Sequence, residues 1–144
     1  LAAVDVVIAM SEFSRRKHGE FGLQREMAVL PYFLPDPPAT ATQAPITASP
    51  SDRPYFFFAG RLERIKGLDD VIPVFAKLPD VDLLIAGDGT HSAALRGIAA
   101  SLPNVKFLGR IAPDELSRYY EQAIALVVPS ECYETFGIVL IESL

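Results

Sequence analysis

Short apolar runs alternate with longer amphipathic stretches through the second half of the chain. The apolar runs at 55–59, 82–86, 105–108 and 124–128 predict strands, and the stretches at 67–78, 91–102 and 113–122 predict helices. The strand runs are apolar on both faces, as in a parallel sheet that helices cover on each side. Parallel strands need crossover connections, so this order predicts an α/β fold with a Rossmann-like parallel sheet. Pro73 should bend its helix or lie near its first turn, whereas Pro113 suits a first helical turn.

The first third of the chain has a different pattern. A β-branched run at 4–9, a charged stretch at 12–20 and an apolar run at 27–34 predict strand, helix and strand, with Ser11 as the helix cap. Residues 31–54 hold seven of the twelve prolines and almost no charge, which is typical of a linker. The predicted organisation is an N-terminal piece at 1–34, a proline-rich connection at 35–54 and a main domain at 55–144.

Composition narrows the classes of function. The chain has 144 residues, of which 50% are hydrophobic and 22% charged, so it can bury a core. A formal net charge of -5 makes nucleic acid an unexpected partner. The single cysteine, Cys132, excludes an internal disulfide and favours a cytoplasmic setting, and no apolar run reaches the roughly 18 residues of a membrane span. His18 and His91 lack ligand-spaced partners and no Asp-x-Asp triplet occurs, so we expect no metal.

Both ends of the chain fall inside predicted elements, a strand at the start and a helix at the end. We therefore expect a fragment of a longer protein. Missing sheet strands would leave an apolar edge uncovered, which predicts poor solubility or self-association.

A loop with cations follows the first strand of the main domain. Gly60 and Gly67 bracket it, and it carries three basic residues, including Arg61 and Lys66. An arginine can bind phosphate oxygens in a bidentate manner, and a lysine adds a point charge. The sequence contains neither a P-loop nor a dinucleotide fingerprint here. The alternatives are a solvated basic loop and a diphosphate site.

A second loop connects the strand at 124–128 to a helix behind Gly137. Glu134 lies on this loop and Glu142 lies on the helix, so the two carboxylates can contact different parts of one extended ligand. Thr135 can cap the helix, whose free N–H groups then favour an anion. The alternative is that both glutamates are solvated surface residues.

Two more strand ends complete the predicted edge. Asp88 lies between two glycines after the second strand, and turn chemistry explains that segment. Arg110 and Ile111 follow the third strand, where Ile111 is otherwise a packing residue. Ligands of parallel sheets bind at the carboxyl ends of the strands, so we expect the site at this edge.

These motifs resemble one family. The pattern Ser-x-x-x-Glu-x-Phe-Gly-x-x-x-x-Glu, at 130–142, is similar to the donor-site signature of the large retaining family of GT-B glycosyltransferases that has two glutamates with seven residues between them (family four). Many bacterial cell-wall and exopolysaccharide enzymes belong to it. The Gly-Arg and Lys-Gly pairs at 60–61 and 66–67 resemble the same family, as do the segments at 11–16 and 31–35. The resemblance implies most of the C-terminal, donor-binding domain and a small remnant of the N-terminal acceptor domain.

The resemblance also implies roles for single residues. Arg61 and Lys66 would bind the diphosphate of a nucleotide sugar, and Glu134 the hydroxyls of its sugar. Glu142 would take the ribose hydroxyls. The remaining donor-binding positions implied by the family are Gly60, Arg110, Ile111, Thr135, Phe136, Gly137 and Ile138. No cofactor and no metal are implied.

The expected function is therefore transfer of a hexosyl-type sugar from a nucleotide diphosphate to an acceptor hydroxyl with retention, in polysaccharide biosynthesis. We expect the fragment alone to be inactive. The alternatives are a nucleotide-sugar epimerase of the same fold, a non-catalytic nucleotide-binding module and, less closely, a glycoside hydrolase with two carboxylates. Peripheral association of the full-length protein with the inner face of the membrane also stays open.

Overall fold

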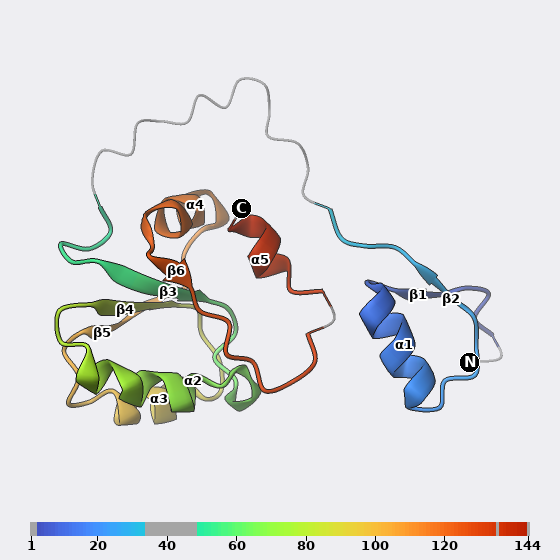
Figure 1. Cartoon of the computed structure of the whole chain (residues 1–144), viewed down its shortest axis with the longest axis horizontal. Coiled ribbons are helices and arrows are strands. Elements are labelled where there is room, and N and C mark those ends of the chain that lie inside the picture. Colours follow the sequence, from blue (N-terminus) through green and yellow to red (C-terminus); the bar gives the residue numbers. More distant parts are fainter. Residues whose placement is uncertain (1–2, 34–48, 135, 144) are drawn as a thin grey trace, which may run out of the picture.

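A computed structural model describes residues 3–33, 49–134 and 136–143 of the chain. Its main unit is a four-stranded parallel sheet in the order β5-β4-β3-β6 (Figure 1). The strands are β3 (Tyr55–Ala59), β4 (Asp82–Ala86), β5 (Val105–Gly109) and β6 (Ala125–Leu126). The α/β class and the parallel sheet are thus as predicted. All four strands end at the same edge, because their pairing is parallel throughout.

Helices cover both faces of this sheet (Figure 1). The helices are α2 (Leu68–Val71), the 3₁₀ helix η2 (Ile72–Lys77), α3 (Ser92–Ile98), α4 (Pro113–Gln122) and α5 (Ile138–Glu142). Alternate residues of a strand point to opposite faces, and the strands supply two cores accordingly. Phe58 belongs to the core under α2, η2 and α3, whereas Phe57 packs under α4. Tyr55 fastens α4 to β3, because its hydroxyl donates to the carbonyl of Tyr119 at 3.0 Å.

Some predicted bounds were wrong. The stretch at 67–78 is not one helix, because α2 gives way to η2 where Pro73, which has no N–H, enters the second position of the 3₁₀ segment. Helix α3 ends at Ile98, before a tight turn that leads to Pro103. Strand β6 pairs at two positions only. In contrast, β3, β4 and α4 have the predicted bounds.

The N-terminal residues form a separate small unit. Strands β1 (Val7–Ala9) and β2 (Met27–Val29) pair in parallel, and α1 (Glu12–Glu20) lies between them in the chain. Ser11 caps α1 as predicted, accepting from the amide of Ser14 at 3.1 Å. Most of the predicted linker at 35–54 lies outside the described residues, so the division into domains stays a prediction.

Apolar side chains are exposed on both units. Val6 and Ile8 of the β1 segment are 62% and 45% exposed, and Ile124 beside β6 is 55% exposed. The predicted self-association would use such surfaces and remains a prediction. None of the helices in the described part of the chain combines the length and the hydropathy of a membrane span.

Candidate functional site

Two loops far apart in sequence meet beyond the carboxyl ends of β3 and β6. One contains the 3₁₀ turn η1 (Arg64–Lys66), and the other leads from β6 to α5. The amide of Glu131 donates to the carbonyl of Ile65 at 2.9 Å. At Gly67, where φ is +70°, a Cβ would lie 2.2 Å from the carbonyl oxygen of Pro129. Only glycine therefore permits the close approach of the two loops.

This approach brings Lys66 and Glu134 together. Lys66 Nζ lies 2.5 Å from Glu134 Oε1, and the hydroxyl of Ser130 donates to the same oxygen at 2.6 Å. The side chains of Lys66 and Glu134 are 20% and 34% exposed. The cluster is thus held by charge-assisted hydrogen bonds yet stays open to a ligand.

The electrostatics of the cluster keep Glu134 ionised. The hydrogen bond from Lys66, and then the one from Ser130, lower the pKa of the Glu134 carboxyl below its ordinary value, against a smaller opposing effect of burial. At neutral pH the carboxylate is therefore an acceptor of hydrogen bonds. Its two protein donors share Oε1, so Oε2 is the oxygen that they do not occupy.

A cavity of about 220 Å³ opens beside this cluster; we call it the inner cavity. Seven of the residues proposed from the sequence line it, namely Gly60, Arg61, Lys66, Glu134, Phe136, Gly137 and Ile138. Thr135 lies outside the described residues. Helix α5 begins at Ile138, with Gly137 as its N-cap and no side-chain capping bond, so the predicted capping position was two residues too early. With five residues, α5 contributes little dipole for an anion.

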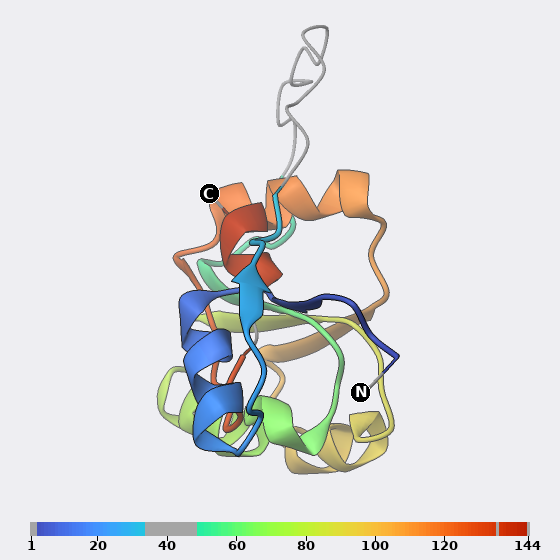
Figure 2. The same cartoon turned by 90° about the vertical axis from the view of Figure 1, so that its right-hand side faces the viewer.

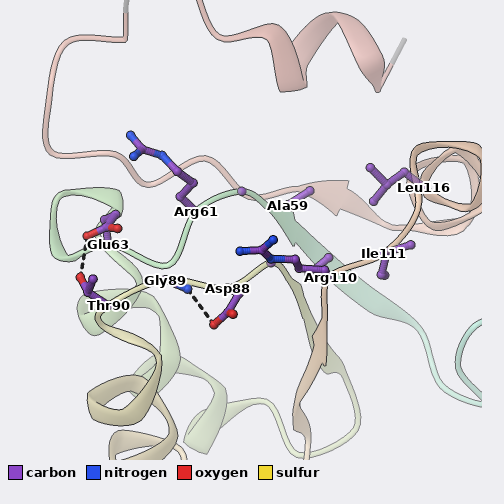
Figure 3. A pocket seen from close by; sticks show the side chains of 12 residues that line it. Ala59, Arg61, Glu63, Asp88, Gly89, Thr90, Arg110, Ile111 and Leu116 are labelled. Carbon is purple, nitrogen blue, oxygen red and sulfur yellow. Dashed lines mark hydrogen bonds between the residues drawn. The ribbon is translucent and has the colours of Figure 1, made fainter.

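A larger cavity of about 730 Å³, the outer cavity, lies along the ends of β3, β4 and β5. Figure 3 shows Arg61 after the end of β3, Arg110 after the end of β5, and Asp88, which follows the intervening strand β4, below Arg110. A Cβ at Gly87 would lie 1.8 Å from the carbonyl oxygen of Gly60, so a side chain there would force the two strand ends apart. Glycine at this position therefore lets the ends of β3 and β4 lie close together where they line the cavity.

The two cavities adjoin, because Ala59, Gly60 and Arg61 line both. Arg61 therefore stands at their junction, with Lys66 in the inner cavity and Arg110 in the outer one. Ile111 also lines the outer cavity. The predicted edge thus carries three cations, which line two adjoining cavities.

Among the predicted site residues that the structure describes, Glu142 alone lines neither cavity. It is exposed on α5, and its Oε2 accepts from the hydroxyl of Tyr120 at 3.4 Å. Burial, and then the nearby charge of Glu142, raise the pKa of Tyr120 to about 12. The ribose-binding role of Glu142 stays a prediction.

Sequence reasoning gave no role to several residues of this region. Ser130 was quoted only as part of a motif, although it holds Glu134. Thr90 and Glu63 face each other on the rim of the outer cavity, with the hydroxyl donating at 2.9 Å (Figure 3). Tyr32 reaches the inner cavity from the N-terminal unit. A polar residue four positions before Glu134 was the available signal for Ser130, whereas nothing local marks Tyr32.

Asp88 behaves as turn chemistry predicts, since its Oδ1 accepts from the amide of Gly89 at 2.8 Å and from Ser92 Oγ at 3.1 Å. Hydrogen bonds from Gly89 and then Ser92 lower the pKa of Asp88. Within the described ranges, no group of three or more His, Cys, Asp or Glu could hold a metal ion. That the reaction needs no metal stays a prediction.

Comparison with known proteins identifies a family and individual proteins that this chain resembles in sequence. The family model of the glycosyl transferases group 1 matches residues 40–144. The sulfoquinovosyl transferase SQD2 of Arabidopsis thaliana is 33% identical over 93 residues, which cover 65% of this chain and 18% of that protein. The phosphatidyl-myo-inositol mannosyltransferase of Mycobacterium tuberculosis is 32% identical over 143 residues, or 95% of this chain and 37% of that protein.

Solved structures agree with the sequence relatives. The sucrose-phosphate synthase of Thermosynechococcus elongatus superposes with a TM-score of 0.78 at 27% identity, covering 97% of this chain and 38% of that one. HepE of Anabaena, in complex with UDP and glucose, superposes with a TM-score of 0.75 at 22% identity, covering 96% of this chain and 41% of that one. The chain thus spans less than half the length of these relatives, with the GT-B fold over part of the C-terminal domain. It belongs to the group 1 glycosyl transferases.

Proposed function

We propose that this chain provides the donor site for transfer of a sugar from a nucleotide diphosphate to an acceptor hydroxyl, with retention of configuration. The observation that carries the proposal is the cluster of Lys66, Glu134 and Ser130 in the wall of the inner cavity. A fixed cation and an ionised acceptor stand there side by side. A sugar diphosphate has the complementary pair of groups, namely phosphate oxygens and hydroxyl donors.

The geometry suggests where each part of the donor binds. The outer cavity, with Arg110 and Ile111, has room for the nucleoside. Arg61 at the junction and Lys66 beside it suit the diphosphate, and the inner cavity with Glu134 suits the sugar. The donor would then extend along the strand ends, where parallel sheets bind their ligands.

The charge that develops on the diphosphate during the reaction explains the roles of Arg61 and Lys66. The bond between the anomeric carbon and the phosphate oxygen breaks, and its electron pair goes to the diphosphate. The acceptor oxygen bonds to that carbon on the same face, and its proton passes to the departing phosphate oxygen. Arg61 and Lys66 stabilise the charge that grows on the diphosphate, as preorganised electrostatic catalysis requires.

Glu134 acts as an anion in this scheme. Its lowered pKa suits it to accept hydrogen bonds from sugar hydroxyls and to stabilise positive charge on the sugar. A glycoside hydrolase needs, besides an ionised carboxylate, a second carboxyl group of raised pKa across the scissile bond. Among the described residues that line the inner cavity, Glu134 is the only carboxyl group. This contrast favours the transferase over the hydrolase.

The relatives suggest the acceptor class. Their names include a lipopolysaccharide core biosynthesis glycosyltransferase of Rhizobium meliloti, 27% identical over 142 residues, beside the phosphatidyl-myo-inositol mannosyltransferase. We therefore propose a hexosyl-type donor and an acceptor hydroxyl on a cell-surface glycan or lipid. Such a reaction would take place in the cytoplasm, at the inner face of the membrane.

Calorimetric titration with UDP, GDP and ADP tests the proposal. One of the three should bind, and the Arg61→Ala/Lys66→Ala double variant should lose at least tenfold in affinity, because a hydrogen bond to a charged group contributes about 1.5–3 kcal/mol. The double variant Arg64→Ala/Lys77→Ala is the matched control, since it removes equal charge from residues that line neither cavity. Binding that survives in the first variant, or that both variants lose equally, contradicts the site.

Retention needs a separate measurement. NMR of the product formed by the full-length protein, taken before the anomers equilibrate, should show the same anomeric configuration as the donor. An inverted product contradicts this part of the proposal without affecting the donor site.

A further inference from the structure

The described backbone of the loop that carries Glu134 is held to its own unit near its two ends, and between them the side chain of Glu134 bonds to Lys66. The amide of Glu131 bonds to Ile65, and α5 begins at Ile138. The described residues between these points belong to no helix or strand. Figure 1 shows this loop on the side of the main unit that faces α1 and β2, and Figure 2, viewed from that side, shows α1 and β2 in front of the main unit.

Aromatic residues on both sides of Glu134 pack against the N-terminal unit. The rings of Phe13 and Tyr133 meet edge to face, with centroids 5.4 Å apart and planes at 73°. The rings of Tyr32 and Phe136 meet in the same way, at 5.6 Å and 70°. We call these four residues the aromatic clamp. Glu134 lies in sequence between its two inner members.

A cation strengthens one half of the clamp. Lys17 Nζ lies 5.0 Å from the centroid of the Tyr133 ring and 5.9 Å from that of Phe13. Glu20 fixes this lysine, since its Oε2 accepts from Nζ at 2.6 Å. Helix α1 therefore presents Tyr133 with an aromatic ring and a positioned positive charge, which together favour one orientation of Tyr133.

We infer that the aromatic clamp positions Glu134, so that the N-terminal unit controls how well the site holds the sugar. The inference rests on the proposed function for its consequence, while the clamp itself is a contact between described residues. The residues that line the outer cavity all come from the main unit. The clamp should accordingly affect affinity for the sugar and spare affinity for the nucleotide.

Phe13→Ala is the cleanest variant. Phe13 lies outside the inner cavity and is 37% exposed, so its removal touches neither a ligand contact nor a buried core. Phe13→Tyr keeps the ring and should behave as wild type. Phe33→Ala is the matched control, since it removes a ring that is 82% exposed from the same unit and that lies outside the cavity lined by Phe13, Tyr133 and Glu134.

The first readout is hydrogen–deuterium exchange of the free chain. The amides of Glu131 and Leu140, which form hydrogen bonds at the two ends of the loop, should exchange roughly two- to tenfold faster in Phe13→Ala, the range that one edge-to-face pair contributes. Phe13→Tyr and Phe33→Ala should leave the rate unchanged. Equal exchange in Phe13→Ala and wild type overturns the clamp, whether or not any nucleotide binds.

The second readout compares UDP with UDP-glucose, or the corresponding pair of whichever base binds. Phe13→Ala should weaken the nucleotide sugar by a similar two- to tenfold and leave the nucleotide unchanged. Faster exchange without this selective loss overturns the positioning of Glu134. A wild-type chain that binds no nucleotide contradicts the proposed function instead, and the exchange experiment still decides the clamp.

Discussion

The two ends of the sheet carry the same chemical group in different surroundings. At the amino end, Asp82 accepts from Lys106 Nζ at 2.5 Å and from Ser51 Oγ at 2.7 Å. At the carboxyl end, Glu134 accepts from Lys66 and Ser130 at 2.5 and 2.6 Å. Each cluster thus holds one carboxylate, one lysine and one serine, and Asp82 has in addition a longer ion pair with Arg53 at 3.9 Å.

The two clusters differ in how deeply their carboxylates are buried. The side chain of Asp82 is 1% exposed on β4, and its Oδ1 has no hydrogen-bond partner among the described residues, whereas Glu134 is 34% exposed on a loop. A buried ion pair costs desolvation and is expensive to break, but an open one is free to exchange a protein partner for a ligand. This difference predicts that the cluster on the strand stabilises the fold and that the cluster on the loop is available to a ligand.

Removing the buried carboxylate should have the largest effect on stability. Asp82→Ala leaves the Ser51 hydroxyl without its acceptor and opens a cavity, while Lys106, 47% exposed, can turn to water. We expect a loss of about 2–4 kcal/mol in the free energy of unfolding, measured by urea titration. Glu134→Ala should cost less than about 1 kcal/mol. Equal losses would contradict the assigned difference.

The next effect concerns the loops that meet at Gly67. Gly67→Ala puts a Cβ 2.2 Å from the Pro129 carbonyl and a side chain at φ +70°. We expect a loss of about 1–2 kcal/mol in stability and weaker nucleotide binding, because the loops must separate. Gly97→Ala is the control: it lies in α3 with no atom within 4 Å of the added Cβ, and should stabilise by about 0.5–1 kcal/mol. A tolerated Gly67→Ala would show that the close approach is unnecessary.

The sequence predicted the bounds of helices and strands correctly where local chemistry is strong. The aromatic run of β3, the apolar run of β4 and the Pro113 start of α4 specify their own elements. Arg61, Lys66 and Glu134 were found because their loops carry glycines and charges after apolar runs. The contacts of Ser130, Gly67 and Tyr32 were not, since each depends on how segments distant in sequence pack together.

Asp82 was missed for a related reason. A single acid at the start of an apolar run is compatible with an exposed strand end, and nothing local shows that Ser51 and Lys106 will enclose it. In the same way, the sequence predicted that Glu142 lies on the helix that follows the Glu134 loop. It could not show that Tyr120 would contact Glu142.

The smallest expected effect is on the pH dependence of stability. Burial raises the pKa of Asp82, but hydrogen bonds from Lys106 and Ser51 outweigh it and leave the pKa below the ordinary value. A lowered pKa gives stability that is present above the unfolded pKa and lost as pH falls through the folded one. Urea midpoints should therefore fall below about pH 4 in wild type and fall less in Asp82→Asn. Parallel curves would contradict this assignment.

The most direct test of the donor site is the affinity of Glu134→Gln for a nucleotide and for its nucleotide sugar, measured by calorimetry with Glu131→Gln as the control. Glutamine keeps the size of the side chain and removes its charge. We predict that Glu134→Gln binds the nucleotide like wild type and loses at least about fivefold in affinity for the nucleotide sugar, while Glu131→Gln changes neither. A nucleotide sugar that binds Glu134→Gln as tightly as wild type would contradict the account.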